Sequence, residues 1–324
     1  MERDARRALT ILHPKVSVIS AWHNRGERLE ESIRSVLDQT GVDFEYIVID
    51  DASTDGTSAR LAAIGDPRLR VVRNAANIGF TRSMQRAVDL ARGELIAVHD
   101  AGDTSLPGRL AAQAAFLDAH PDHVAAGVLV ADIEPGTERR VVRQNPPVHA
   151  PDAARQQNPF THGEVMFRKQ AYAAAGGYRE VFYYAQDMDL WLRLREQGPL
   201  GVVDQVLYQR NLFEGGIQGD PARMALQQVF SNLARHAAIE RAAGRPDPVD
   251  RLAALAVLRQ PPLPIFRARL AGSVKALLKR GEWSAAGDVL AAVPAGMIGT
   301  RLLLVALALR LAAGLSRPFR GGRA

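Results

Sequence analysis

The first hundred residues alternate between short apolar runs and amphipathic stretches. Four runs rich in Val, Ile and Leu are typical of buried strands, and they fall at residues 16–20, 44–49, 69–73 and 95–98. Between these runs apolar residues recur at helical spacing, and the first such set is Leu29, Ile33, Val36 and Leu37. This alternation predicts βαβ units, and therefore an α/β fold with a mostly parallel sheet covered by helices on both faces.

The rest of the chain predicts two different parts. Further strands are expected at residues 124–130, 164–167 and 202–208, with a helix at 187–196 and a loop at 145–158. From residue 221 onward Ala, Leu and Arg follow helical spacing, and prolines divide the segment into several helices. We therefore expect an α/β domain of residues 1–220 and an all-helical C-terminal region of residues 221–324.

Charge divides the chain at the same place. Residues 1–220 carry 25 Lys and Arg against 30 Asp and Glu, a net charge of −5. Residues 221–324 carry 16 against 5, a net charge of +11. An acidic body argues against a nucleic-acid partner, whereas a basic helical region favours contact with something anionic.

The last expected helix, from about residue 297 to 315, is interrupted by arginines, so a span across the bilayer is the least favoured of three interpretations. The other two are favoured for this basic end. It is either the core helix of a small helical cap with a solvated tail, or an interfacial helix that brings residues 297–323 to an anionic membrane surface.

The composition leaves few chemistries open. The chain has no Cys, which excludes disulfides, thiolate nucleophiles and cysteine-ligated metal centres. It also lacks a P-loop, a dinucleotide-binding fingerprint, an HExxH zinc motif and a nucleophile elbow. The apolar run near the N-terminus is too short for a signal peptide, so we expect a cytoplasmic protein.

Carboxylates remain as the candidate chemistry. Asp51 follows the second predicted strand, and Asp100 and Asp103 follow the fourth. In parallel sheets ligands bind beyond the carboxyl ends of the strands, and carboxylate oxygens suit Mg²⁺ or Mn²⁺. Taken singly, Asp100 with Asp103 is more typical of a turn, and Asp50-Asp51 of a strand end. Asp187 begins a predicted helix, where it either stabilises the helix dipole or acts as a general base.

The order of the motifs resembles the inverting family-2 glycosyltransferases of the GT-A fold. This resemblance covers about residues 14–210, and the matching blocks are 16–25, 32–40, 47–57, 77–83, 91–103, 165–168, 176–178 and 186–193. Several blocks in the right order are far more specific than any one of them. One departure lies in the acidic turn, where Gly102 occupies a position at which the family usually has an acid.

The resemblance implies a role for each matching residue. Asp187 corresponds to the catalytic base, and Asp100 and Asp103 to the acids that bind Mn²⁺ or Mg²⁺. Nucleotide-sugar contacts are implied for Ala21, Trp22, Asp51, Arg82 and Asp100. Acceptor-side or supporting positions are implied for His162, Gly163, Gly177 and Trp191. For His162 and Gly163, a plain junction between a loop and a strand is the favoured alternative.

These observations predict a metal-dependent inverting glycosyltransferase. It would move a sugar from a nucleotide-sugar donor to a glycan or lipid-linked acceptor, in bacterial surface polysaccharide assembly, in the cytoplasm or at the inner face of the cell membrane. One alternative is a nucleotidyltransferase, although the glycine- and lysine-bearing phosphate loop that such enzymes need near the first strand is missing. The other is a non-catalytic nucleotide-sugar-binding scaffold on the same fold.

Overall fold

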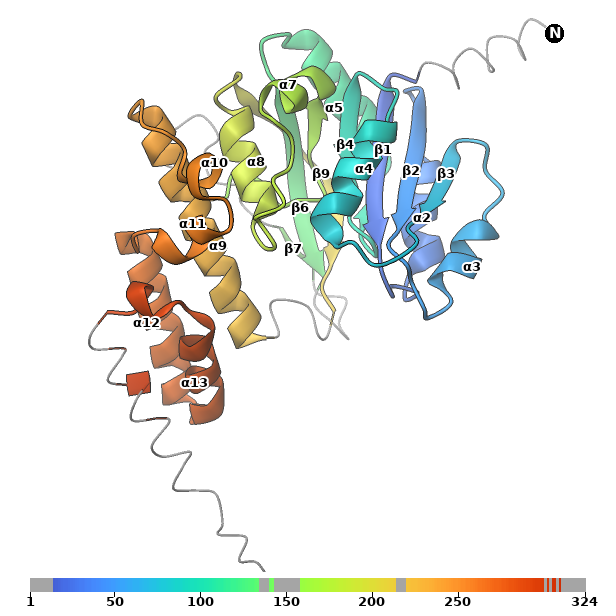
Figure 1. Cartoon of the computed structure of the whole chain (residues 1–324). Coiled ribbons are helices and arrows are strands. Elements are labelled where there is room, and N and C mark those ends of the chain that lie inside the picture. The colour runs from blue at the N-terminus through green and yellow to red at the C-terminus, as the bar shows by residue number, and fades with distance from the viewer. Residues whose placement is uncertain are drawn as a thin grey trace, which may run out of the picture. The chain divides into compact units, whose positions relative to one another are not determined.

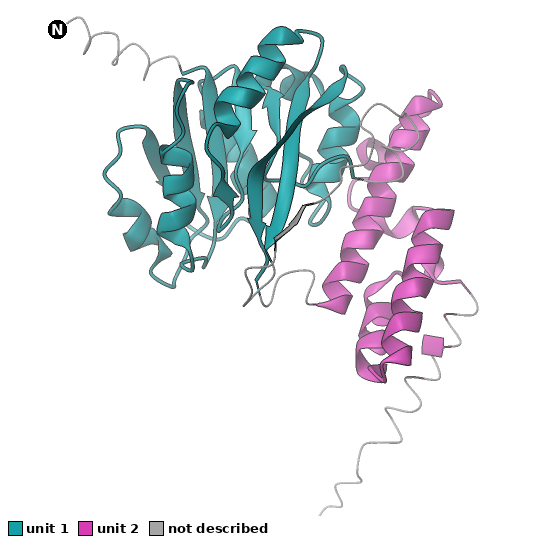
Figure 2. Cartoon of the chain, turned by 180° about the vertical axis from the view of Figure 1, so that it is seen from behind, with its two compact units in different colours: residues 1–213 teal, residues 214–324 magenta. Residues whose placement is uncertain are grey.

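The computed structural model of the chain describes residues 14–133, 140–142, 158–213 and 220–299, together with 302, 305, 306 and 309. The chain forms two compact units, residues 1–213 and 214–324 (Figure 2). The predicted loop at 145–158 lies outside the described residues apart from Asn158. Most of residues 297–323 lies outside them as well, so the two interpretations of the basic end stay predictions.

In the part of the chain that the structure describes, the first unit is built on one mixed sheet of nine strands (Figure 1). Four parallel strands stand in the order β3-β2-β1-β4: β1 (Val16–Trp22), β2 (Phe44–Asp50), β3 (Leu69–Arg73) and β4 (Leu95–Val98). The sheet continues from β4 in the order β8-β6-β9-β5: β5 (Thr104–Ser105), β6 (Ala125–Ile133), β8 (Met166–Arg168) and β9 (Leu200–Asn211). β8 is antiparallel to both β4 and β6, β9 is parallel to β6, and β7 (Arg140–Val142) pairs with β6. The predicted α/β architecture is confirmed.

Helices cover both faces of this sheet. One hydrophobic core contains side chains from α2 (Leu29–Leu37), α3 (Thr57–Ala62) and α5 (Arg109–Ala119). The other contains side chains from α4 (Phe80–Leu90), α7 (Lys169–Ala174) and α8 (Gln186–Leu194). Successive side chains of β1 pack alternately in the two cores, since Val18 lies in the first core and Ile19 in the second. This two-residue period is that of a strand buried on both faces.

The second unit consists of helices, as the proline spacing predicts. They are α9 (Pro221–Ala242), α10 (Pro248–Leu252), α11 (Leu255–Arg259), α12 (Pro264–Lys279), α13 (Trp283–Ala292) and the 3₁₀ turn η2 (Ala295–Met297). Proline occupies the start of α9, α10 and α12, where its missing N–H costs no hydrogen bond. Of the helices that the structure describes, none is both long and apolar enough to cross a membrane.

Candidate functional site

The candidate site begins where β2 and β4 end, on either side of β1. Because the three strands are parallel, their carboxyl ends meet at one edge of the sheet, the edge at which α/β folds bind ligands. Asp51 follows β2 directly, and its amide donates to the Trp22 carbonyl at 2.7 Å. Asp100 lies just beyond β4, in a turn that Gly102 completes with a φ of +89°. The predicted acids therefore share this edge.

The Asp51 carboxylate organises the segment that leads into α4. It is buried and accepts three hydrogen bonds, from Asn74 Nδ2 at 2.7 Å and from the backbone amides of Ile78 at 2.8 Å and Gly79 at 2.9 Å. A carboxylate held by three donors has little freedom to reorient. Asp51 thus fixes the shape of the loop beside the site, and its nucleoside contact stays a prediction.

Asp100 and Asp103 share a partner from the far side of the sheet. The Tyr208 hydroxyl, on β9, donates to Asp103 Oδ2 at 2.9 Å and accepts from the Asp100 amide at 3.0 Å. The Asn211 amide donates to Asp103 Oδ1 at 3.0 Å, so both oxygens of Asp103 are engaged. Asp100 is more open, with about a third of its side chain exposed.

The carboxyl groups of Asp100 and Asp103 differ in the direction of their pKa shifts. Burial, reinforced by the negative charge of Asp100, raises the pKa of Asp103 to about 8. Burial also acts to raise the pKa of Asp100, but the charge and hydrogen bond of His162 outweigh it, and the pKa lies below its usual value. Asp100 is therefore the carboxylate that carries the negative charge of the turn near neutral pH.

His162 connects this turn to the opposite wall of the site. Its Nδ1 lies 2.7 Å from Asp100 Oδ1, and its Nε2 lies 2.9 Å from the Tyr178 hydroxyl. The imidazole also stacks on the Trp191 ring, with centroids 6.2 Å apart. Burial lowers the pKa of His162, but Asp100 together with the carboxylates of Asp187 and Glu164 raises it more, so the net shift is upward. His162 therefore complements the charge of Asp100.

Asp187 lies in the first turn of α8, preceded by Ala185 at a φ of +55°. Its Oδ2 accepts a hydrogen bond from Asn158 Nδ2 at 2.7 Å. Burial raises the pKa of Asp187, and the charge of His162 opposes this only partly. One turn later, Trp191 is fully buried against the His162 ring. α8 thereby joins the expected base to the same cluster of side chains as Asp100.

Gly163 is required by the position of Tyr208. A Cβ atom at residue 163 would lie 2.0 Å from the Tyr208 hydroxyl, the group that holds both acids of the turn. Gly177 is also required by the local structure. Its φ is +66°, and a Cβ atom there would lie 2.9 Å from the Tyr172 ring. Neither glycine has to touch a ligand to be needed at its position.

We expect Gly163→Ala to disturb the acidic turn from a distance. Displacement of Tyr208 should lower the free energy of unfolding by about 1–3 kcal/mol and weaken Mn²⁺ binding. Gly65→Ala is the matched control, since a Cβ there meets no atom within 4 Å and its effect should stay within about 0.5 kcal/mol. Chemical denaturation and Mn²⁺ titration measure both quantities. Equal behaviour of the two variants would contradict this role of Gly163.

Three of the residues predicted to contact the nucleotide do not lie beside the carboxylates as exposed side chains. The side chains of Ala21 and Trp22 are buried, and the Trp22 indole donates to Ser20 Oγ at 2.8 Å within the core. Arg82 is exposed on α4 and pairs with Glu180 at 2.7 Å. The structure therefore presents neither the Ala21 nor the Trp22 side chain to a ligand, and it does not bring Arg82 into contact with the carboxylates.

Several residues of the site had no role in the sequence-based prediction. The Tyr208 hydroxyl and the Asn211 backbone amide donate to Asp103, and the Asn158 side chain donates to Asp187. Arg25 donates to the Ala101 carbonyl at 3.3 Å, and its guanidinium lies 3.6 Å from the centre of the Phe213 ring. Arg25 lies within one of the matching sequence blocks, whereas Tyr208 and Asn211 carry no local signal that links them to residues 100–103.

Comparison with known proteins shows the family to which the sequence is similar. The sequence model described as "Glycosyl transferase family 2" matches residues 17–176. EpsE of Bacillus subtilis, a protein named as a glycosyltransferase, is 39% identical over 204 residues, which are 60% of this chain and 72% of EpsE. The amylovoran biosynthesis glycosyltransferase AmsE of Erwinia amylovora is 30% identical over 201 residues, which are 59% of this chain and 74% of AmsE.

Solved structures agree on the fold. TarS of S. aureus, residues 1–349 in complex with UDP, superposes with a TM-score of 0.57 at 17% identity, covering 96% of this chain and 94% of that chain. The mannosyltransferase PcManGT of Pyrobaculum calidifontis, in complex with GDP-Man and Mn²⁺, superposes with a TM-score of 0.55 at 21% identity, covering 98% and 88%. The predicted GT-A fold is confirmed.

Proposed function

This chain belongs to glycosyl transferase family 2 and is a glycosyltransferase, and from this premise we propose that the site around Asp100 and Asp187 transfers a sugar from a nucleotide-sugar donor to an acceptor hydroxyl with inversion. One observation carries the proposal. His162 contacts Asp100 through Nδ1 and packs on Trp191 of the helix that bears Asp187. The anionic turn and the base thus belong to one connected group of side chains.

Asp187 is proposed as the general base. The acceptor hydroxyl oxygen forms the new bond to the anomeric carbon as its proton passes to the Asp187 carboxylate. The bond from the anomeric carbon to the donor phosphate breaks, and the nucleoside diphosphate leaves with that electron pair. Burial raises the pKa of Asp187, which makes it a stronger base than an exposed aspartate. A single displacement of this kind inverts the anomeric centre.

The turn at residues 100–103 suits a divalent ion that also binds the donor. Within the described residues no group of three His, Asp or Glu side chains could enclose a metal by itself. Mg²⁺ and Mn²⁺ sites often use one or two carboxylates and leave the other positions to phosphate oxygens and water. We propose that Asp100 would hold the ion directly and that Asp103 orients the turn. Such an ion would supply positive charge to the leaving diphosphate.

We expect the two acids to respond differently to substitution. Asp100→Asn should weaken Mn²⁺-dependent binding of a nucleoside diphosphate by tenfold or more, about 1.4 kcal/mol. Asp103→Asn should weaken it less, because both Asp103 oxygens are already engaged by Tyr208 and Asn211. Thermal-shift titration with UDP or GDP, with and without Mn²⁺, measures this binding and also screens the donor base. Metal-independent binding to the wild type would refute the metal assignment.

The names of the relatives support a role in polysaccharide assembly. AmsE is named for amylovoran biosynthesis, and ExoO of Rhizobium meliloti, 40% identical over 97 residues, for succinoglycan biosynthesis. We propose that this chain adds a sugar to a glycan or lipid-linked acceptor during assembly of a bacterial surface polysaccharide. The basic helical region, with a net charge of +11 over residues 221–324, supports attachment to the inner face of the cell membrane.

A further inference from the structure

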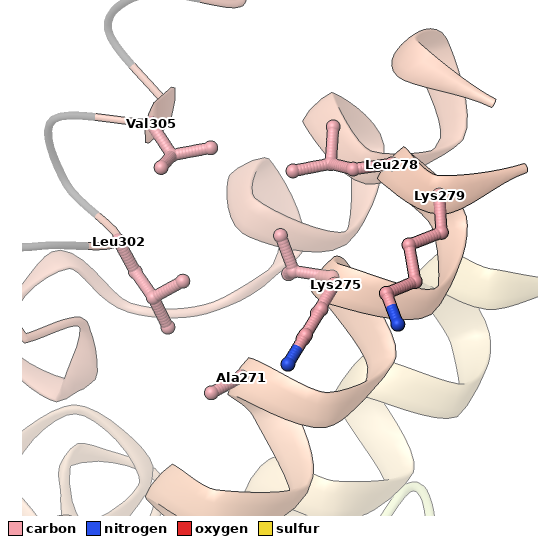
Figure 3. A pocket seen from close by; sticks show the side chains of 7 residues that line it. Ala271, Lys275, Leu278, Lys279, Leu302 and Val305 are labelled. Atoms are coloured by element: carbon pink, nitrogen blue, oxygen red, sulfur yellow. The ribbon is translucent and has the colours of Figure 1, made fainter. Parts of the chain in front are cut away.

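The second unit contains an apolar groove that the sugar-transfer reaction does not use. It has a volume of about 440 Å³ beside α12 and is largely open to solvent. Figure 3 shows Ala271, Lys275 and Lys279 projecting from α12, with Leu302 and Val305 on the segment opposite. Val274 and Leu278 complete the lining. Apart from the two lysines, every lining residue is apolar.

The two lysines give one side of this groove a positive charge. α12 carries four basic residues and no acidic residue, so neither lysine has a carboxylate neighbour on its own helix. Lys275 and Lys279 are one helical turn apart, and both are exposed. They are two of only four lysines in the whole chain.

Three other exposed cations of this unit have a carboxylate partner. Arg223 pairs with Asp220, Arg245 with Glu240, and Arg280 with Glu282. No ion pair of this kind is found for Lys275 or Lys279 among the residues that the structure describes. The groove therefore combines apolar walls with positive charge at one side.

A ligand that matches these walls is itself amphipathic. An apolar chain would replace water along Leu278, Leu302 and Val305, and an anion would approach the two ammonium groups. Exposed apolar surface bordered by polar groups commonly marks an interaction site. A soluble sugar nucleotide would place hydroxyls against these apolar walls, which disfavours it as the occupant.

We propose that this groove binds one acyl chain of an anionic membrane phospholipid, with the lipid phosphate at Lys275 and Lys279. This site lies on α12 and does not depend on residues 310–324. It goes beyond the proposed transfer reaction by assigning a lipid site to a helix outside the catalytic unit. A bound lipid of this kind would attach the enzyme to the membrane through a defined contact, in addition to any diffuse attraction from the basic end of the chain.

The charge part of the proposal is tested by vesicle binding of the full chain. Vesicles of phosphatidylcholine mixed with phosphatidylglycerol are compared with vesicles of phosphatidylcholine alone by co-sedimentation. Each lysine should contribute about fivefold in affinity, so Lys275→Gln with Lys279→Gln should weaken binding about 25-fold. The matched control is Arg251→Gln with Arg259→Gln, which removes the same charge from exposed positions outside the groove. Equal losses in the two double variants would overturn the proposal, because the attraction would then be diffuse.

The apolar part is tested by filling the groove without changing its charge. Ala271→Trp places an indole in the groove and should also weaken vesicle binding, whereas Ala276→Trp, exposed on the same helix but outside the lining, should not. Full binding by Ala271→Trp would overturn the proposal, and so would a dimer in solution that Ala271→Trp dissociates, since a second copy would then be the occupant. These measurements need neither donor nor turnover, so their failure would leave the proposed transfer reaction intact.

Discussion

Asp187→Asn is expected to lower kcat by about 10²–10⁴-fold, the usual contribution of a general base. Asparagine keeps the shape of the side chain and its approach to Asn158, but it cannot take up the acceptor proton. Donor binding should stay near the wild-type value, because Asp187 lies on α8 and not in the turn at residues 100–103. A steady-state assay of sugar transfer gives kcat, and a titration with nucleoside diphosphate gives the binding constant.

The pH profile supplies an independent readout of the same base. Because burial raises the pKa of Asp187, the ionised form is complete above the raised pKa and is lost as the pH falls through it. The wild-type kcat should therefore fall on the acidic side at a higher pH than an ordinary aspartate would produce. Asp204→Asn, an exposed position on β9, is the matched control and should leave the profile unchanged. Turnover by Asp187→Asn at the wild-type rate would refute the assignment.

Asp189→Ala should produce the largest loss of stability, about 3–5 kcal/mol in the free energy of unfolding. Asp189 is 1% exposed and accepts hydrogen bonds from two arginines. Arg179 Nε lies 3.0 Å and Arg193 Nη2 2.6 Å from its Oδ2. Removing the carboxylate takes the negative charge of Asp189 away from both guanidinium groups, in a site that water reaches poorly. Chemical denaturation followed by circular dichroism measures the change.

An exposed ion pair provides the comparison for Asp189. Glu30 pairs with Arg60 on the surface, where both side chains are roughly half exposed. Glu30→Ala should therefore lower the free energy of unfolding far less than Asp189→Ala, because solvent screens exposed pairs. If Asp189→Ala lowered the free energy of unfolding no more than Glu30→Ala, the buried group of Asp189, Arg179 and Arg193 would not be a major source of stability. Asp187 and Asp189 are two residues apart on α8, yet one is expected to govern rate and the other stability.

The difference between these two aspartates shows what the sequence could and could not predict. Both lie in the first turn of the predicted helix, and helical spacing places them on different sides of it. The resemblance to known glycosyltransferases singled out Asp187. That Asp189 neutralises Arg179 and Arg193 depends on how the segment before α8 packs against the helix, and no local pattern contains that information.

Trp22 also shows what a sequence motif cannot predict. Its motif placed it beside a nucleotide base, but the structure buries its indole among α2 and the neighbouring strands. A motif match identifies which stretch of chain approaches a ligand. It does not say whether the side chain or the backbone faces that ligand, because this depends on which face of the strand is covered.

The sequence by itself determined the α/β architecture, the helical C-terminal region and the stretches that end in acids. These features follow from local periodicity, and the carboxyl ends of neighbouring parallel strands necessarily share one edge of a sheet. Only the tertiary structure decided that Asp100 pairs with His162, 62 residues away, and that Asp103 pairs with Tyr208, 105 residues away. Such contacts arise from the pairing of β8 with β4 and from the path of β9, which bring distant side chains into one buried region where burial and neighbouring charges set their pKa values.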